Sequence, residues 1–435
     1  KASVMKTTWI CTTQDKPWAD RSGEIAEASG ETNLRITDRR AQTMRGFGGC
    51  FNELGWAALA GVSDPQRRAV TEALFGRTGC RFRRCRVPIG ASDYAMKWYS
   101  HDEHDGDVEL DHFSIDRDEQ YLLPYIDAAR AVQPRLELFA SAWSPPTWMK
   151  HPQAYNHGTL RWTPEIRSAY ARYLVKFVEA YRGRGIDVAA VHVQNEPDSD
   201  QKFPSCKWTG EQMREFIRDD LRPALDAAGL SEIEVWLGTI ERGDYDRWIA
   251  PTLLDDAARA ATAGVGFQWA GRGAVQRTHL AAPDLPLTQT ENECGDGNNT
   301  WAHALHVVEL IHHYLVNGVS AYTYWNMVLP PGGRSTWGWR QNTMITADPK
   351  TGSITYNPEY HVMRHLAGWV DEGAVRLETD GLWTASALAF ANPDGRTVVF
   401  IANPQPHAQP VTIDLSPRRR RIDLPPRSVS TLAMG

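Results

Sequence analysis

Eight apolar segments alternate with helical segments along the first 370 residues, and this alternation constrains the fold more than any other feature. The clearest is 188–194, where β-branched residues flank alanines, as expected for a parallel strand that is buried on both faces. The predicted strands are residues 46–51, 81–88, 136–143, 188–194, 233–240, 265–269, 287–291 and 319–325.

Helical patterns lie between these strands. The clearest is Pro164–Tyr181, where apolar residues such as Ile166, Tyr170 and Phe177 recur at helical spacing. The other predicted helices are residues 54–59, 63–75, 118–132, 209–227, 245–263, 301–315 and 359–369, and the weakest unit follows the sixth strand. Eight such units predict a (β/α)8 TIM barrel, an α/β fold, over residues 41–371.

The pattern changes at residue 372. From there to residue 435 the chain contains short alternating segments separated by turns, such as Asn392–Arg396, and these predict an all-β domain. Residues 1–40 contain two further strand candidates, 4–8 and 33–37. Because unpaired strands are an aggregation liability, we expect residues 1–40 to join residues 372–435 in one β-sandwich.

Composition excludes several classes of protein. The chain has 435 residues, 42% of them hydrophobic, and a net charge of −6, with Arg418–Arg421 as its longest basic run. This indicates a folded protein without a nucleic-acid footprint. No apolar run reaches the roughly 20 residues of a membrane span. The first residues lack a signal-peptide pattern, and both secretion after cleavage of a signal and a cytoplasmic location stay open.

We expect neither a metal nor a cofactor. The six cysteines lack the spacing of a zinc site, and His101 and His104 form an isolated His-x-x-His in an acidic loop without a second ligand cluster. The glycines of Gly46–Gly49 lack the dinucleotide-binding spacing, so they predict a close backbone approach beside a ligand.

Two glutamates follow predicted strands. Glu196 ends the fourth strand, because Pro197 cannot continue a β-ladder, and Glu291 ends the seventh. The ends of barrel strands form the catalytic rim, so both carboxylates are expected there. Two carboxyls suit glycoside hydrolysis, in which one protonates the leaving oxygen while the other, ~5 Å away, attacks the anomeric carbon. The alternative for Glu196 is a turn with a solvated carboxylate.

Other residues at strand ends fit the same chemistry. Arg86 would favour the ionised form of a neighbouring carboxyl, and the alternative is a structural ion pair beneath the rim. The chain has 17 tryptophans, whose flat apolar faces suit sugar rings. Trp143 and Trp325 lie at strand ends and are expected to form the floor of the site, whereas Trp148 is compatible with the core.

Several motifs together resemble glycoside hydrolase family 30, the glucocerebrosidase-like family within the clan of retaining β-glycosidases. They are Gly46-Phe47-Gly48-Gly49, Arg86-Val87-Pro88, Ser92-Asp93-Tyr94, residues 141–150, Asn195-Glu196-Pro197, Thr290-Glu291 and Tyr324-Trp325-Asn326. The resemblance covers nearly the whole chain and implies a barrel with a side β-sandwich.

The resemblance also implies roles for single residues. Glu196 would be the acid/base, Glu291 the nucleophile, and Asn195 the ligand of the sugar 2-hydroxyl. The substrate would further contact a set of side chains that bind its hydroxyls, line its subsite or orient the nucleophile. These are Glu53, Arg86, Trp143, Trp269 and Trp325.

Two departures from the family pattern stand out. The chain has Gln268-Trp269-Ala270 where the family usually has His-Trp-Tyr, so the hydroxyl that supports the nucleophile is missing. Glu53 replaces the usual Asp, which lengthens a sugar-binding carboxylate by one methylene.

Three functions are compatible with these features. The first is a retaining β-glycosidase for neutral sugars, similar to a β-glucosidase or glucosylceramidase. The second is an endo-acting β-1,6-glucanase or xylanase. The third is a non-catalytic carbohydrate-binding relative, against which the presence of both Glu196 and Glu291 argues. The partner in each case is a carbohydrate or glycoconjugate, and the sequence leaves the oligomeric state open.

Overall fold

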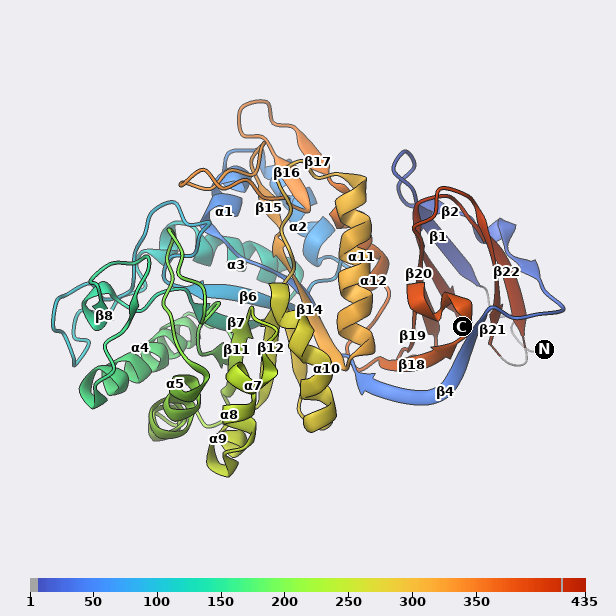
Figure 1. Ribbon diagram of the computed structural model, residues 1–435. Coiled ribbons are helices and arrows are strands. Elements are labelled where there is room, and N and C mark those ends of the chain that lie inside the picture. The colour runs from blue at the N-terminus through green and yellow to red at the C-terminus, as the bar shows by residue number, and fades with distance from the viewer. Residues whose placement is uncertain (1–6, 416–417) are drawn as a thin grey trace.

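The computed structural model describes residues 7–415 and 418–435 and confirms the predicted barrel with a side β-sandwich (Figure 1). Eight parallel strands close in the order β10-β11-β12-β13-β14-β5-β6-β7. Their bounds are β5 Gly46–Cys50, β6 Arg84–Ile89, β7 Glu137–Ala142, β10 Val188–His192, β11 Glu234–Ile240, β12 Gly264–Gln268, β13 Leu287–Glu291 and β14 Val319–Asn326. All residues of β5, β6, β13 and β14 are buried.

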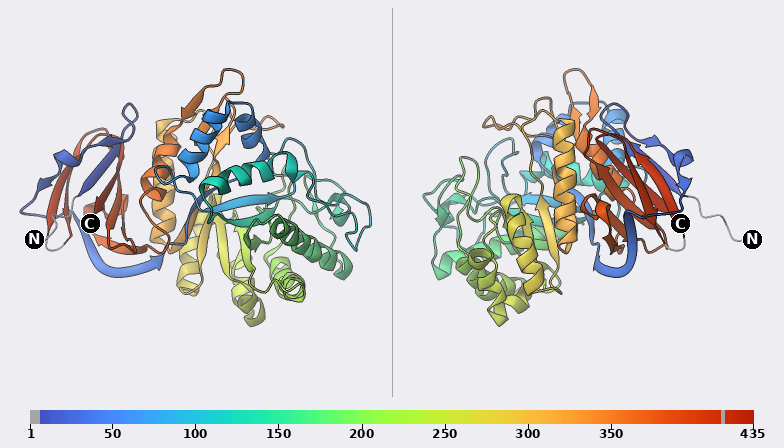
Figure 2. Two further views of the ribbon diagram at one scale, coloured as in Figure 1. Left: turned by 180° about the vertical axis from the view of Figure 1, so that it is seen from behind. Right: turned by 45° about the vertical axis from the view of Figure 1, so that its right-hand side comes forward.

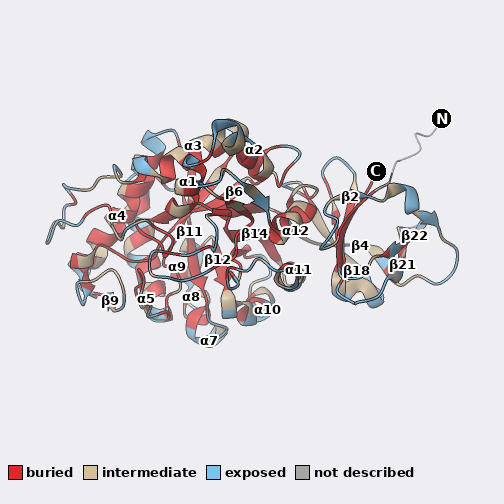
Figure 3. Ribbon diagram, turned by 90° about the horizontal axis from the view of Figure 1, so that it is seen from above, coloured by how far each residue is buried: buried red, intermediate tan, exposed pale blue. Residues whose placement is uncertain are grey.

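Helices surround the strands and bury one face against them, so that the exposed residues lie on the outer helical faces (Figure 3). They are α1 Glu53–Ala60, α2 Asp64–Phe75, α3 Leu122–Val132, α4 Pro164–Gly183, α5 Gly210–Glu215, α6 Arg222–Ala227, α7 Tyr245–Trp248, α8 Ala250–Leu253, α9 Asp256–Ala261, α10 Arg272–Ala281, α11 Trp301–Val316 and α12 Pro358–Ala367. In α4, the Thr163 side chain accepts from the Ile166 N–H and Pro164 occupies the first turn, which accounts for its sharp start.

The structure differs from the predicted helices in three places. The predicted helix 245–263 is three short helices, because Asp255 caps a new start and Pro251 interrupts the pattern. The predicted helix 209–227 contains a π-helical turn at Phe216–Leu221. The unit after the sixth strand contains the helix α10, which was not predicted because its sequence has few apolar residues.

Strands from both ends of the chain build the sandwich. Its ten-stranded sheet has the order β2-β1-β23-β20-β19-β18-β4-β21-β22-β3. The strands are β1 Thr8–Thr12, β2 Ala19–Asp20, β3 Ala26–Glu27, β4 Leu34–Thr43, β18 Val375–Asp380, β19 Ala387–Ala391, β20 Thr397–Asn403, β21 Gln409–Asp414, β22 Arg419–Leu424 and β23 Ser428–Met434. The predicted strand 4–8 lies mostly outside the described residues, and β4 is longer than the predicted strand 33–37. We propose that the barrel begins after Thr43, where β4 ends.

The sandwich packs directly on the barrel, and β4 leads from one to the other (Figure 2). Alternate residues of β20 serve two cores: Val399 and Ile401 belong to the core of the sandwich, whereas Val398 and Phe400 belong to the large core of the barrel. Because both faces of this strand are covered, its sequence is apolar almost throughout. The two domains therefore share a continuous packed interface.

Candidate active site

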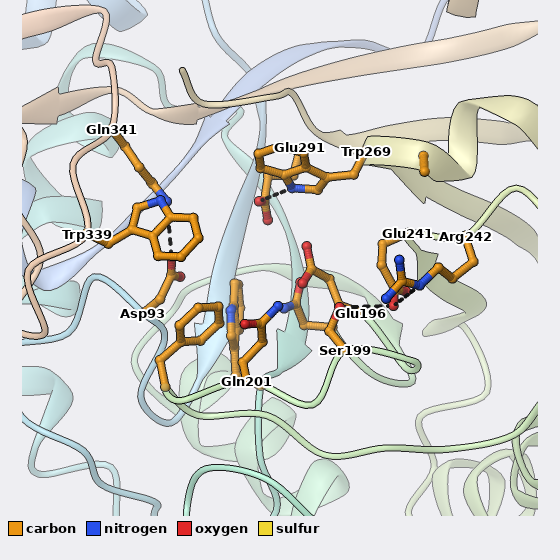
Figure 4. Close-up of a pocket in the computed structure, with 14 residues that line it drawn as sticks. Asp93, Glu196, Ser199, Gln201, Glu241, Arg242, Trp269, Glu291, Trp339 and Gln341 are labelled. Carbon is orange, nitrogen blue, oxygen red and sulfur yellow. Dashed lines mark hydrogen bonds and ion pairs between the residues drawn. The ribbon is translucent and has the colours of Figure 1, made fainter. Parts of the chain in front are cut away.

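A cavity of about 280 Å³ opens at the carboxyl-terminal rim of the barrel (Figure 4). Asp93, Trp339 and Gln341 lie at one end of it, Glu241 and Arg242 at the other, and Glu196 and Glu291 between them. The structure thus brings the two predicted catalytic glutamates into one cavity, although they are far apart in the sequence.

Local backbone geometry aims the side chains of Glu196 and Trp269 into the cavity. The Glu196 N–H donates to the Thr239 carbonyl over 3.1 Å, and the backbone of Glu196 is left-handed with φ of 47° before Pro197. Trp269, just after β12, has φ of 48°. Left-handed backbone is strained for residues other than glycine and clusters at functional sites, so both residues are held where they are by the surrounding structure.

One amide group connects the two glutamates. The Gln268 Nε2 atom donates to Glu196 Oε1 over 3.1 Å and to Glu291 Oε2 over 3.2 Å. These two oxygens are therefore at most about 6.3 Å apart, which is below the separation typical of inverting glycosidases. A separation below that range fits direct attack of one carboxylate on the sugar better than attack by an intervening water.

Arg86, from β6, is fully buried beneath the cavity and organises its floor. Its guanidinium donates to Glu291 Oε2 over 2.8 Å, to Asn195 Oδ1 over 2.7 Å and to Ser141 Oγ over 2.9 Å. Its Cζ atom lies 4.5 Å from the ring centroid of Trp143. These acceptors and the aromatic face fix the guanidinium, so the ion pair with Glu291 belongs to the site itself.

The hydrogen bonds to the two carboxylates are unequal. Glu291 accepts from Arg86, from Gln268 and from the Trp269 indole N–H over 3.1 Å, whereas no cation among the described residues forms a hydrogen bond with Glu196. Burial raises the pKa of both groups, that of Glu291 to about 7, and the charge of Arg86 opposes the increase at both. The cation and the two N–H donors at Glu291 stabilise a negative charge there, which favours Glu196 as the carboxyl that keeps the proton.

Asn195 presents its amide nitrogen to the cavity. Its oxygen already accepts from Arg86, from Gln268 over 3.1 Å and from the Thr239 hydroxyl over 3.3 Å. The nitrogen is the group left for a ligand, and a donor beside both glutamates suits a sugar hydroxyl.

Trp143 and Trp325 form one aromatic unit, with ring centroids 5.5 Å apart and planes at 29°. Trp143 lines the cavity, and Trp325 lies behind it and donates to Gln341 Oε1 over 2.7 Å. Gln341 in turn donates to Asp93 Oδ2 over 3.4 Å. The aromatic floor and the carboxylate at the end of the cavity are therefore connected through one glutamine.

The structure does not bring Glu53 into the cavity. At the start of α1 it is 2% exposed, and its Oε2 atom accepts from the Met96 N–H over 2.7 Å and from Arg117 over 3.0 Å. The sequence-based expectation that it holds a sugar hydroxyl therefore finds no support, because Arg117 holds it elsewhere. Asp93, within a motif noted in the sequence, is the carboxylate that reaches the cavity.

Sequence reasoning overlooked several cavity residues. Glu241 directly follows β11, so the rule that found Glu196 and Glu291 would also have found it. Asp93 follows Arg86 by seven residues in a loop after β6. Gln341, Trp339, Gln201 and Phe203 come from long loops, whose paths the sequence does not reveal.

Metal and membrane features were searched in the described part of the chain. No cluster of three or more His, Cys, Asp and Glu side chains is placed there to hold a metal ion. Among helices within residues 7–415 and 418–435, none combines the length and apolar character needed to cross a bilayer.

A parallel barrel whose rim holds two neighbouring carboxylates is the arrangement of a retaining glycoside hydrolase. The chain belongs to glycoside hydrolase family 30, a family of retaining β-glycosidases. Residues 44–370 match the family model of the Glycosyl hydrolase family 30 TIM-barrel domain, and residues 373–432 match that of the family 30 beta sandwich domain.

Known proteins of two kinds are similar to it. The lysosomal acid glucosylceramidase of Mus musculus is 26% identical over 429 residues, which cover 90% of this chain and 81% of that protein. The endo-1,6-beta-D-glucanase of Neurospora crassa is 26% identical over 388 residues, covering 84% and 79%. The crystal structure of SrfJ from Salmonella typhimurium is 25% identical, with a TM-score of 0.91 over 98% of this chain and 99% of that one.

Proposed function

We propose that this enzyme hydrolyses β-glucosides, with Glu291 as the nucleophile and Glu196 as the acid/base. The observation that carries the proposal is the Gln268 amide, which contacts both carboxylates and holds them at nucleophile spacing. Glu291 attacks C1 of the sugar while Glu196 gives its proton to the leaving oxygen. Glu196 then takes a proton from water, which attacks C1 and releases Glu291 from the glycosyl ester.

The charge of the cavity supports a neutral sugar in the site. Four carboxyl groups line it: Asp93, Glu196, Glu241 and Glu291. Of the described residues that line it, only Arg242 is cationic, and it pairs with Asp198 over 3.3 Å. Arg86 is occupied by protein acceptors. A uronic acid would therefore meet the Glu291 anion and no unpaired cation among these lining residues, whereas sugar hydroxyls can pair with a carboxyl group in either protonation state.

The relatives support glucose as that sugar. Both a glucosylceramidase and an endo-1,6-beta-D-glucanase, named for glucosyl substrates, are about equally similar to this chain. The same comparison supports a second candidate function, cleavage within a β-1,6-linked glucan. The two differ in the leaving group and share the glucosyl unit.

The test is a panel of aryl β-glycosides with the sugar varied. We expect the β-glucoside to give the highest kcat/KM and the β-glucuronide to give no turnover. Proton NMR of the first product should show the β-anomer. Glu291→Gln should lower kcat by roughly 10⁴-fold or more, because it removes the nucleophile.

Glu293→Gln is the matched control, because Glu293 lies two residues further on and binds His306 Nε2 over 2.8 Å outside the cavity lining. It should keep kcat within a few fold. A first product with the α-configuration, or loss of activity in Glu293→Gln instead of Glu291→Gln, would contradict the assigned roles. Release of oligosaccharides from a β-1,6-glucan would select the second candidate.

A further inference from the structure

Glu241 is a cavity residue that the two-glutamate mechanism does not use. It directly follows β11 and is 4% exposed. Its Oε1 atom accepts from the Asp198 N–H over 3.0 Å and from the Ser199 hydroxyl over 3.1 Å. Its Oε2 atom is buried and has no hydrogen-bond partner among the residues that the structure describes.

An ion pair with Arg242 does not explain why Glu241 Oε2 has no hydrogen-bond partner. Arg242 Nε lies 3.6 Å from Glu241 Oε1, which is long for a hydrogen bond, and Arg242 also pairs with Asp198. Other buried side-chain atoms of the described residues also lack a partner, Glu53 Oε1 among them, and each needs an explanation of its own. Because Glu241 also lines the cavity, a ligand group that donates a hydrogen bond is the simplest one.

The position of Glu241 in the cavity indicates which part of a substrate it would contact. In Figure 4, Glu241 and Arg242 lie on the side of Glu196 that is opposite to Asp93 and Gln341. Trp143, Asn195 and Asp93 provide the aromatic face and polar groups for the glycone. Since Glu196 protonates the oxygen of the leaving group, the Glu241 side of the cavity receives the leaving group.

Ala270 opens space on the same side. It lines the cavity, and the next residue, Gly271, packs so closely on Ile240 that a Cβ atom there would collide with the Ile240 carbonyl. The segment after β12 is thus in direct contact with the last residue of β11, which places Ala270 near Glu241. A small side chain at this position leaves room for a bulky leaving group.

We infer that Glu241 binds a hydroxyl group of a sugar or polyol leaving group in the space beside Ala270. This inference rests on the proposed function and adds the chemical class of the leaving group. Burial, and then the charge of Glu196, raise the pKa of Glu241 to about 8. The side chain is therefore largely protonated at neutral pH and can both accept from and donate to a hydroxyl.

The experiment compares two substrates with the same glycone. One is gentiobiose, whose leaving group is a sugar, and the other is an aryl β-glucoside, whose leaving group offers no hydroxyl. The measured quantity is the ratio of their kcat/KM values in the wild type, Glu241→Leu and Glu241→Gln. Glu234→Gln is the control, because it makes the same change at the opposite end of β11.

We expect Glu241→Leu to lower the ratio by about 10- to 100-fold, since a site built to bind a hydroxyl discriminates strongly. Glu241→Gln should lower it less, because an amide still pairs with a hydroxyl, and Glu234→Gln should leave it within twofold. Equal losses on both substrates in Glu241→Leu would overturn the inference, because Glu241 would then only position the loop at Asp198.

A binding measurement separates this inference from the proposed function. In the Glu291→Gln background, titration calorimetry with gentiobiose and methyl β-glucoside needs no turnover. Introducing Glu241→Leu into this background should raise the Kd of gentiobiose tenfold or more and raise the Kd of methyl β-glucoside less. If the wild type hydrolyses neither substrate but this difference is found, the proposed function fails and the leaving-group subsite stands. If Glu241→Leu raises neither Kd, or raises both equally, the leaving-group subsite is refuted.

Discussion

At the scale of single residues, the site depends on the orientation of the Gln268 side-chain amide. The oxygen accepts from Arg86 over 3.3 Å and from the Thr290 hydroxyl over 2.9 Å, so the nitrogen must face the acceptors Asn195, Glu196 and Glu291. Together with the Trp269 indole, it provides donors to the nucleophile in a chain that lacks the family's usual tyrosine hydroxyl at position 270.

Ala270→Tyr tests the space beside these groups. A tyrosine would fill the cavity wall that we assign to the leaving group, so kcat/KM for gentiobiose should fall about tenfold or more, and that for an aryl glucoside should fall less. If the new hydroxyl donates to Glu291, the acidic limb of the kcat/KM profile should move to lower pH, because a donor to the anion lowers the carboxyl pKa.

Ala270→Ser is the size control and should leave both rates within a few fold. An unchanged profile together with unchanged rates on every substrate would show that position 270 does not border the reacting groups.

At the scale of elements, the glycines of β5 explain how the barrel closes. The sequence suggested that their backbone approaches a ligand, but the structure shows that they approach the protein itself. A Cβ atom on Gly48 would lie 1.8 Å from the Arg84 carbonyl oxygen of β6, and one on Gly49 would lie 2.2 Å from Met327 Cγ. Since β6 carries Arg86, close packing of β5 on β6 also positions the floor of the site.

Gly48→Ala should therefore destabilise the fold by about 3 kcal/mol or more, because the collision is with backbone that cannot move aside. Gly23→Ala is the control: a Cβ atom there meets nothing within 4 Å, and the expected change is within about 0.5 kcal/mol. Urea unfolding followed by circular dichroism measures both. A Gly48→Ala protein as stable as the wild type would mean that β5 can shift relative to β6.

At the scale of the whole molecule, His365 of α12 connects the barrel to the sandwich. Its Nε2 and Nδ1 atoms lie 2.8 Å from the Thr12 hydroxyl and 2.9 Å from the Thr431 hydroxyl, and its carbonyl accepts from Thr431 over 2.6 Å. The ring is fully buried, and this burial, reinforced by the neighbouring charges of His361 and Arg364, lowers the pKa of His365 to about 3.

His365→Ala should cost about 2–4 kcal/mol of stability, because it removes two buried side-chain hydrogen bonds and the packing of a fully buried ring. A histidine whose folded pKa lies below its unfolded value contributes stability that is present above about pH 6.5 and is lost as pH falls toward 3. The fall in Tm between pH 7 and pH 4 should therefore be smaller in the variant than in the wild type. His407→Ala, at an exposed histidine, is the control. Equal acid sensitivity of the wild type and His365→Ala would contradict this role.

The sequence alone predicted the elements and the two glutamates that the structure brings together. Most barrel strands are rich in apolar residues because they are buried on both faces, so they were visible without long-range information, and Pro197 limited the strand before Glu196, although β10 already ends at His192. The sandwich followed from short alternating segments at both termini. The exact bounds and the divided helices at 209–227 and 245–263 were not predictable, because caps and interruptions there compete with a similar apolar pattern.

The tertiary structure decided which carboxyl groups share the cavity. Glu53, Glu241 and Glu291 all follow barrel strands and look alike in the sequence. Arg117, from a distant loop, binds Glu53 outside the cavity, whereas Glu241 and Glu291 line the cavity and Arg86 pairs with Glu291. Local sequence specifies where a strand ends, but the charge and partners of a side chain depend on groups that only folding brings within hydrogen-bond distance.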